Sequence, residues 1–212
     1  MSDTVDALLP LSFLEAVRGV DTPEGEYDAA LIAELRSKRL GLSETVYLQI
    51  RRYTDAVRRN QPAEQDEAVA LARLIGRRPD AEAVFRAAGR YIARETYETI
   101  SPLTRRLMRA LPALIARPIA LRRARRIAHH YFDARLRRSG SFLLLDVDHS
   151  ITIASAPNAV GCTYYEDALR ELLRLLVGGT GAVEHVRCLG RGDETCEWRA
   201  EWRPVDGAAP AA

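Results

Sequence analysis

The sequence lacks any apolar run approaching the roughly 18 residues that a helix needs to span a membrane. Its first ten residues carry two acids and no basic residue, so they do not resemble a secretory signal peptide. We therefore expect no transmembrane segment and a cytoplasmic location, where thiols stay reduced. The composition, 47% hydrophobic and 28% charged, is that of an ordinary globular protein.

Several motifs of common enzyme classes are also missing. The chain has no nucleophile elbow, dinucleotide fingerprint or glycine-rich phosphate loop. The glycine-rich run at 178–181 follows a predicted helix and precedes a predicted strand, which is the reverse of the order in a phosphate cradle. The sequence therefore favours a binding role over independent catalysis, while enzymatic activity stays open.

The net charge of only +2 gives the whole chain no strong field, but the charge is unevenly distributed. Between Arg105 and Arg138 there are eleven arginines and one acid. This stretch is a solvated face neutralised by acids elsewhere in the fold, a surface for an anionic membrane or a carboxylated ligand, or a nucleic-acid surface. No helix-turn-helix signature accompanies it, so we expect no nucleic-acid partner.

Cysteine is scarce, and all three cysteines lie in the last third of the chain, between Cys162 and Cys196. Two β-rich runs there flank the turn-forming residues 190–193 and predict a hairpin. A turn centred on Gly192 sets three pairs of residues opposite one another: Cys188 with Cys196, Arg187 with Glu197, and Val186 with Trp198. The hairpin would bring two thiols together.

Two adjacent thiols form a disulfide, bind a metal or simply pack. A reducing compartment disfavours the disulfide, and one bridge would leave Cys162 unexplained. Zinc takes about four nitrogen or sulfur ligands, and His185 is the best fourth donor. In an ideal strand it faces away from Cys188, so it would need a bulge or an irregular strand start to reach the metal. We predict a structural zinc site at Cys162, His185, Cys188 and Cys196, with three buried thiols as the alternative.

The residues of this stretch form a recognisable pattern. Cys162 precedes a helix predicted over Tyr164–Val177, and the pattern continues as His185-x-x-Cys188-Leu189-x-x-Gly192-Asp193-x-x-Cys196-x-Trp198. It resembles the 4-vinyl reductase domain family, whose fold is shared with haem-type nitric-oxide-binding domains and Golgi-trafficking subunits. In phenol-responsive regulators of that family, three cysteines and a glutamate hold zinc, and His185 occupies the glutamate position here.

A second set of residues is similar to bacteriochlorophyll 4-vinyl reductase-like proteins. It consists of the run 103–115, the step Ser139-Gly140-Ser141-Phe142 and the helix start Cys162-x-Tyr164-Tyr165. Together the two resemblances cover roughly residues 80–203. They imply a domain that binds a small hydrophobic or aromatic molecule, or one that handles a tetrapyrrole.

The remaining patterns predict an α+β fold: an antiparallel sheet of two hairpins packed by helices, with a helical N-terminal half. Ser43 is a predicted N-cap, and a helix starts near Pro118 and continues to Leu136. The runs 142–147 and 151–154 predict the first hairpin. We expect a helical N-terminal extension over 1–40, the ligand-binding domain over 41–204 and a disordered tail over 205–212.

A candidate ligand pocket lies near the end of the arginine-rich helix. Such pockets are mainly apolar with a few polar groups. Two histidines and three aromatic residues fit that description, although buried, hydrogen-bonded histidines are the simpler interpretation. The predicted lining is His129, His130, Tyr131, Phe132 and Phe142.

These patterns favour a small-molecule binding or sensing domain with a structural zinc ion. The first alternative is a carrier or vinyl-reductase-associated protein that binds a tetrapyrrole. The second is a dimeric interaction module, as in the trafficking relatives, in which the first forty residues mediate dimerisation. A homodimer is expected in either case.

Overall fold

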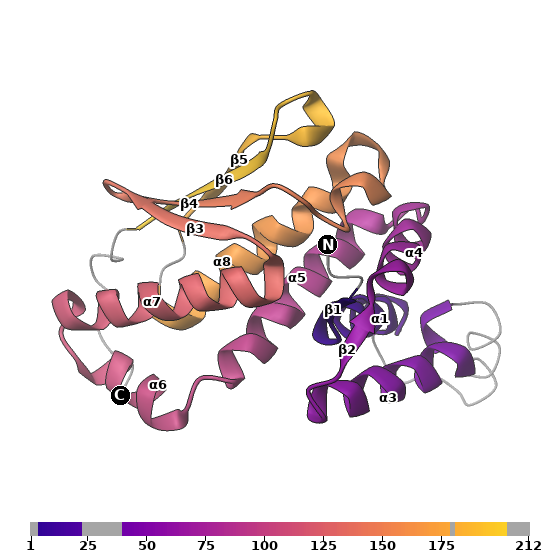
Figure 1. Cartoon of the computed structure of the whole chain (residues 1–212), viewed down its shortest axis with the longest axis horizontal. Coiled ribbons are helices and arrows are strands. Elements are labelled where there is room, and N and C mark those ends of the chain that lie inside the picture. Colours follow the sequence, from indigo (N-terminus) through magenta and orange to yellow (C-terminus); the bar gives the residue numbers. More distant parts are fainter. Residues whose placement is uncertain (1–3, 23–39, 179–180, 203–212) are drawn as a thin grey trace. The chain divides into compact units, whose positions relative to one another are not determined.

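The computed structural model describes residues 4–22, 40–178 and 181–202 of the chain. The fold is α+β, as predicted, and the described residues form seven α-helices, a two-stranded sheet and a four-stranded antiparallel sheet (Figure 1). The chain divides into two compact units. The first comprises residues 1–92 and 151–164, and the second comprises residues 93–150 and 165–212.

The first unit is mainly helical. Its elements are β1 (Thr4–Asp6), α1 (Leu8–Asp21), the short 3-10 helix η1 (Leu40–Leu42), α3 (Glu44–Arg58), β2 (Pro62–Glu64), α4 (Gln65–Gly76), most of α5 (Ala81–Glu98), and the 3-10 helices η2 (Ile153–Ser155) and η3 (Pro157–Cys162). Phe13 of α1 is fully buried and meets Phe85 and Tyr164 edge to face, with ring centroids 6.1 and 5.6 Å apart. Helix α1 therefore belongs to the core of this unit.

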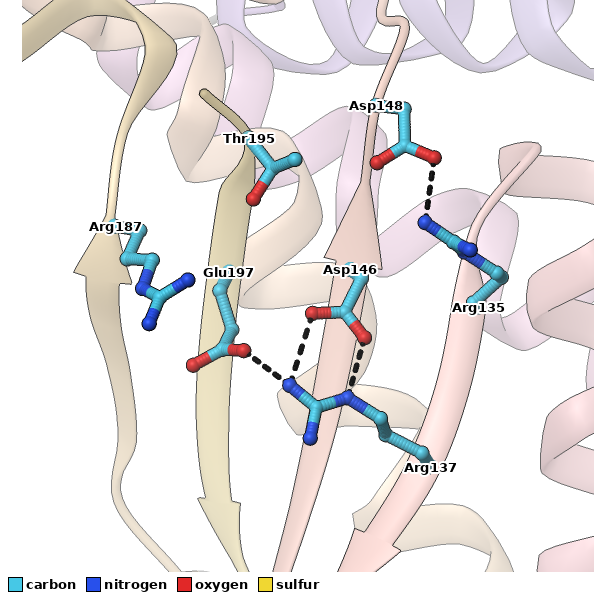
Figure 2. A pocket seen from close by; sticks show the side chains of 7 residues that line it. All are labelled: Arg135, Arg137, Asp146, Asp148, Arg187, Thr195 and Glu197. Carbon is cyan, nitrogen blue, oxygen red and sulfur yellow. Dashed lines mark hydrogen bonds and ion pairs between the residues drawn. The ribbon is translucent and has the colours of Figure 1, made fainter. Parts of the chain in front are cut away.

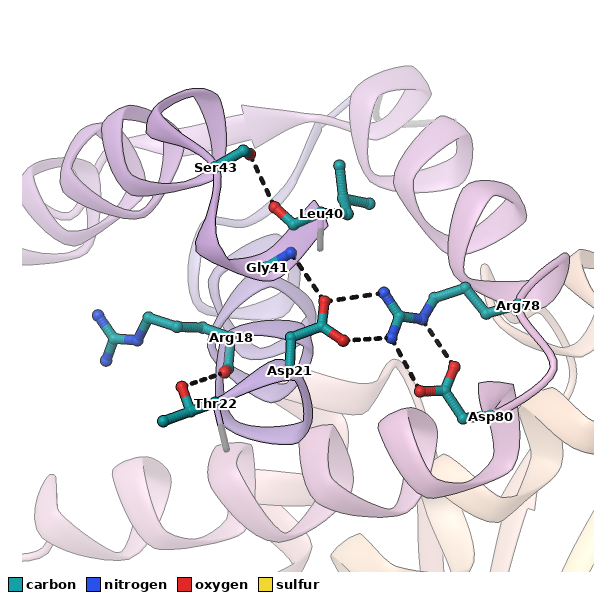
Figure 3. Close-up of polar contacts among 8 residues, drawn as sticks. All are labelled: Arg18, Asp21, Thr22, Leu40, Gly41, Ser43, Arg78 and Asp80. Atoms are coloured by element: carbon teal, nitrogen blue, oxygen red, sulfur yellow. Dashed lines mark hydrogen bonds and ion pairs between the residues drawn. The ribbon is translucent and has the colours of Figure 1, made fainter. Parts of the chain in front are cut away.

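A buried carboxylate fixes the end of α1 (Figure 3). Asp21 accepts hydrogen bonds from the Gly41 N–H at 2.8 Å and from the Arg78 guanidinium at 2.6 and 3.0 Å. A Cβ at Gly41 would lie 2.5 Å from the Val17 carbonyl oxygen, so only glycine fits there. Ser43 caps α3 as predicted, because its hydroxyl accepts the Val46 N–H at 3.3 Å.

The second unit contains the four-stranded sheet. Its elements are α6 (Pro102–Ala110), α7 (Ala113–Phe132), β3 (Arg135–Ser139), β4 (Phe142–Val147), nearly all of α8 (Thr163–Val177), β5 (Val183–Arg187), η4 (Leu189–Arg191) and β6 (Cys196–Glu201). The strand order is β3-β4-β6-β5, with every neighbouring pair antiparallel. Figure 1 shows α7 and α8 on one side of this sheet.

Residues on β4 and β6 alternate between the two faces of the sheet, as the period of two requires. On the face covered by the helices, Leu143, Leu145 and Val147 are buried, and so are Cys196, Trp198 and Ala200. The other face is polar: Arg137 contacts Asp146 at 2.7 Å and Glu197 at 2.5 Å. The face of the sheet that the helices cover therefore shields the thiol of Cys196 from water.

Two sequence predictions about the sheet and the helix before it are wrong. The segment 151–154 does not pair with β4, because Ile153–Ser155 form a 3-10 helix; the partners of β4 are β3 and β6. The arginine-rich helix ends at Phe132 rather than Leu136, because Asp133 adopts a left-handed φ of 46°. Leu136 instead lies on β3, and a turn at Gly140, where φ is +59°, returns the chain into β4.

Other predictions fall partly or wholly outside the described residues. The expected tail at 205–212 is wholly outside them, and so is the part of the N-terminal extension at 23–39. None of the helices that the structure describes is long and apolar enough to cross a lipid bilayer.

Candidate metal centre

Four potential metal ligands converge in the structure. The donor atoms of Cys162, His185, Cys188 and Cys196, here called the metal cluster, all lie within 4.8 Å of one another. All three cysteines are buried, and none of them is in a disulfide. The four residues predicted from the sequence are therefore brought together as a possible metal-binding group.

The backbone places the three thiols at the ends of regular elements. Cys162 comes directly before Thr163, the first residue of α8. Cys188 directly follows β5, and Cys196 begins β6, where it pairs with Val147. Ends of elements have the backbone freedom to aim donors at a common point, while the elements themselves keep those donors in place.

A β-bulge turns the histidine toward the cluster. His185 lies opposite Trp198 and Arg187 lies opposite Glu197, so Val186 is an extra residue between two consecutive positions of β6. The bulge moves His185 to the face of Trp198 and leaves Arg187 on the polar face. The predicted Arg187–Glu197 pairing is confirmed, whereas the predicted Val186–Trp198 pairing is wrong by this one residue.

The imidazole of His185 is held in place by stacking. Its ring lies parallel to the Trp198 indole, with an interplanar angle of 6° and centroids 4.6 Å apart. The Nε2 atom is buried and has no hydrogen-bond partner among the described residues. A buried nitrogen without a partner is destabilising by about 1–3 kcal/mol. Coordination of a metal ion by Nε2 would remove this cost.

Backbone N–H groups stabilise the turn between the two hairpin cysteines. The Leu189 N–H donates to the Cys196 sulfur at 3.2 Å, and the Cys188 N–H donates to a carboxylate oxygen of Asp193 at 2.6 Å. Gly192 has a φ of +94°, which glycine tolerates and which closes the turn. An N–H group aimed at a sulfur favours the thiolate, the form that binds metal.

The donor set fits zinc. Tetrahedral zinc has bonds of about 2.3 Å to sulfur and 2.0–2.1 Å to nitrogen, which sets neighbouring donors about 3.5–3.8 Å apart. The donors of the metal cluster, within 4.8 Å of one another, need move only by roughly half an ångström to reach that geometry. Thiolate and imidazole ligands also select zinc over magnesium and calcium ions, which prefer oxygen ligands.

The segment before Cys162 contains a constraint that sequence reasoning missed. A Cβ at Gly161 would lie 1.8 Å from the Thr152 carbonyl oxygen, and the Thr152 hydroxyl donates to the Gly161 carbonyl at 2.9 Å. This close approach fixes the backbone directly next to Cys162. No local pattern distinguishes Gly161 from the other glycines, because the contact spans nine residues.

An aromatic series extends from the metal cluster into the core of the second unit. His185 stacks on Trp198, whose ring is 5.1 Å from that of Tyr165 on α8. The Tyr165 ring lies 6.2 Å from Phe132 at the end of α7, and its hydroxyl donates to Ser150 at 2.7 Å. Tyr165 and Trp198 therefore connect a candidate metal ligand to a residue of the predicted pocket.

The residues of the predicted ligand pocket lie in different surroundings. His129 and His130 are exposed on α7, and the His130 ring meets Tyr131 edge to face at 4.6 Å. Phe132 is buried, while the half-buried Phe142 on β4 lies under the Arg199 guanidinium at 5.1 Å. A pocket lined by these five residues stays a prediction.

A different pocket lies on the polar face of the sheet (Figure 2). This open depression has a volume of about 290 Å³ and is lined by Arg135, Arg137, Asp146, Asp148, Arg187, Thr195 and Glu197. Arg137 bridges two of the acids, and its hydrogen bond to Asp146 raises the arginine pKa. Three arginines face three acids, so the depression is balanced in charge. It lies on the face of the sheet opposite the Cys196 side chain.

The comparisons with known proteins add no relative. No family model matches the chain, and neither the curated proteins nor the solved structures include a match. The resemblance to the 4-vinyl reductase domain family therefore stays a prediction from the sequence motifs.

Proposed function

We propose that this chain is a small-molecule binding or sensing domain in which a structural zinc ion fixes the C-terminal hairpin. The observation that carries the proposal is the convergence of three cysteine sulfurs and one histidine nitrogen within 4.8 Å. Three of these residues lie in the β5–β6 hairpin, and the fourth precedes α8. A bound ion would tie these segments together.

The donor set favours a structural role for the ion. Catalytic zinc sites use three protein ligands and keep a fourth position for water or substrate, whereas structural sites are closed by four protein ligands. Here all four donors come from the protein, and Cys188 and Cys196 have no exposed surface. A bound ion would therefore have no open coordination position for water.

The binding of a small hydrophobic or aromatic molecule rests on the resemblance of the motif. The aromatic series from Trp198 through Tyr165 to Phe132 supports it by giving the metal cluster a packed connection to one residue of the predicted pocket. Through this series, an aromatic guest near Phe132 would alter the packing around the metal cluster. A tetrapyrrole ligand and a homodimer are the further expectations of the same resemblance.

The test is native mass spectrometry of the full chain purified without added metal. One zinc per chain and a co-purified organic ligand are the expected results. Zinc should be lost in the double variant Cys188→Ser/Cys196→Ser and kept in His149→Ala, which changes an exposed histidine outside the metal cluster. Zinc-free, folded wild-type protein would overturn the metal proposal. Titration with phenol and with a porphyrin, followed by absorption, tests the ligand class separately.

A further inference from the structure

The end of the α6–α7 helix pair presents large apolar side chains to solvent. Four of them form what we call the helix tip: Leu103 and Leu107 on α6, and Leu114 and Ile115 in the first turns of α7, with exposed fractions of 77%, 46%, 87% and 52%. The two helices contact each other, so the four side chains belong to one local structure. Clustered exposure of this kind marks an interaction site.

The helical geometry explains why these side chains point outward. On α6 the buried residue is Met108, and Leu103 and Leu107, which are four positions apart, share a side that turns away from it. On α7 the buried residues Ala120, Ala124 and Ile127 define the inner face, which leaves Leu114 and Ile115 outside. Their exposure is therefore a property of the helix register.

Positive charge continues from the helix tip along the same exposed surface. Residues 101–132 contain eight arginines and no acid. Arg105 forms an ion pair with Glu98 at 2.6 Å, and Arg109 donates a hydrogen bond to the Tyr97 hydroxyl at 3.4 Å. Other arginines make no ion pair with any described residue and are exposed: Arg106, Arg122 and Arg126.

We infer that the helix tip docks onto an anionic lipid surface, with the leucines entering the interface and the exposed arginines contacting lipid phosphates. Leucine and isoleucine next to arginine, without acids, are the composition of segments that lie in the headgroup region. The attachment that we infer is peripheral, since it is made by side chains of the helix tip.

The charge pattern favours a membrane over other partners. A second copy of this chain would bring its own arginines against the same surface, and like charges repel. Nucleic acid would pair with arginine but would leave the exposed leucines in water. An anionic bilayer satisfies both groups at once, because it offers phosphate at the surface and hydrocarbon directly beneath.

Vesicle flotation of the full chain tests the inference. Vesicles of phosphatidylcholine containing about one third phosphatidylglycerol are compared with pure phosphatidylcholine vesicles at low and high salt. Wild-type protein should float with the anionic vesicles and much less with the neutral ones. Leu103→Asp/Leu114→Asp should reduce the bound fraction at least tenfold. Arg106→Gln/Arg122→Gln should reduce it by about fivefold for each arginine.

Matched controls separate the helix tip from general surface effects. Leu74→Asp changes an exposed leucine of α4, and Arg58→Gln changes an exposed arginine of α3; both should float like the wild type. All the substituted side chains are exposed, and unchanged circular dichroism will verify folding. The inference is overturned if wild-type protein ignores anionic vesicles, or if it binds them equally well with both leucines replaced. Self-association that is lost in Leu103→Asp/Leu114→Asp, without vesicle binding, would assign the helix tip to a second copy and also overturn it.

Discussion

Replacing His185 with alanine should destabilise the zinc-loaded protein but leave the stability of the zinc-free protein nearly unchanged. In the zinc-free state the substitution removes a stacking contact on Trp198, which contributes about 0.5–1.5 kcal/mol. It also removes a buried nitrogen that has no hydrogen-bond partner among the described residues. Because such a nitrogen is destabilising by about 1–3 kcal/mol, its removal is favourable. These two effects nearly cancel, so the free energy of unfolding should change little.

In the zinc-loaded state the same substitution removes a ligand. At free zinc one hundred times its dissociation constant, zinc binding adds about 2.7 kcal/mol to the free energy of unfolding. If the affinity falls about a hundredfold, only about 0.4 kcal/mol of that contribution remains. His185→Ala should therefore lose roughly 2.3 kcal/mol with zinc present and close to nothing in a chelator.

The assay is urea unfolding of both proteins, in buffered zinc and in chelator. His185→Cys, which supplies a fourth thiolate, should keep most of the zinc-dependent stability. The exposed His149→Ala should match the wild type in both conditions. Equal losses for His185→Ala with and without zinc would refute the reasoning, because the histidine would then act by packing alone.

Three further predictions concern residues around the site and the two cores. Gly161→Ala should lower both the melting temperature and the zinc affinity, because its Cβ would clash with the Thr152 carbonyl oxygen. Calorimetry with zinc titration measures both quantities. Gly19→Ala is the control, since nothing lies within 4 Å of a Cβ there. Arg78→Met should lower the free energy of unfolding by about 3–5 kcal/mol, because buried Asp21 loses its guanidinium partner, against under 0.5 kcal/mol for the exposed Arg58→Met. Hydrogen bonds from Arg174 and then Arg94 lower the pKa of Glu171 to about 2, so its stabilisation is present above about pH 4.5 and is lost as the pH falls through 2. Glu171→Gln should therefore lower the free energy of unfolding by roughly 2 kcal/mol at pH 7 and by much less near pH 2, while Glu82→Gln, in an exposed pair, should change little at either pH.

The metal cluster was predictable from the sequence because its donors have few competing roles. The last third of the chain holds three thiols, and a histidine lies three residues before the second of them. Few folds of this segment bring two or more of these side chains together. The period of two in a strand also predicted a bulge or an irregular strand start near His185, and the structure has a bulge at Val186. Cys162 was harder to place, and its resemblance to a family motif supplied its role.

The strand pairing was not predictable to the same degree. The sequence of β3 is rich in arginine and continues the composition of the preceding helix, so local pattern assigns Leu136 to that helix. The segment is a strand because it pairs along its length with β4, and Arg137 also contacts Glu197, sixty residues away in sequence. Such distant partners, like the Gly161–Thr152 contact, exist only once the chain has folded.

The most direct test of the central claim is X-ray absorption spectroscopy at the zinc edge of the purified full chain. The account predicts three sulfur atoms at about 2.3 Å and one nitrogen at about 2.0 Å around the metal. In His185→Ala the nitrogen of an imidazole should disappear from the spectrum while the sulfur shell stays. A metal surrounded only by oxygen and nitrogen, or by fewer than three sulfurs, would contradict the assignment of Cys162, Cys188 and Cys196 as ligands.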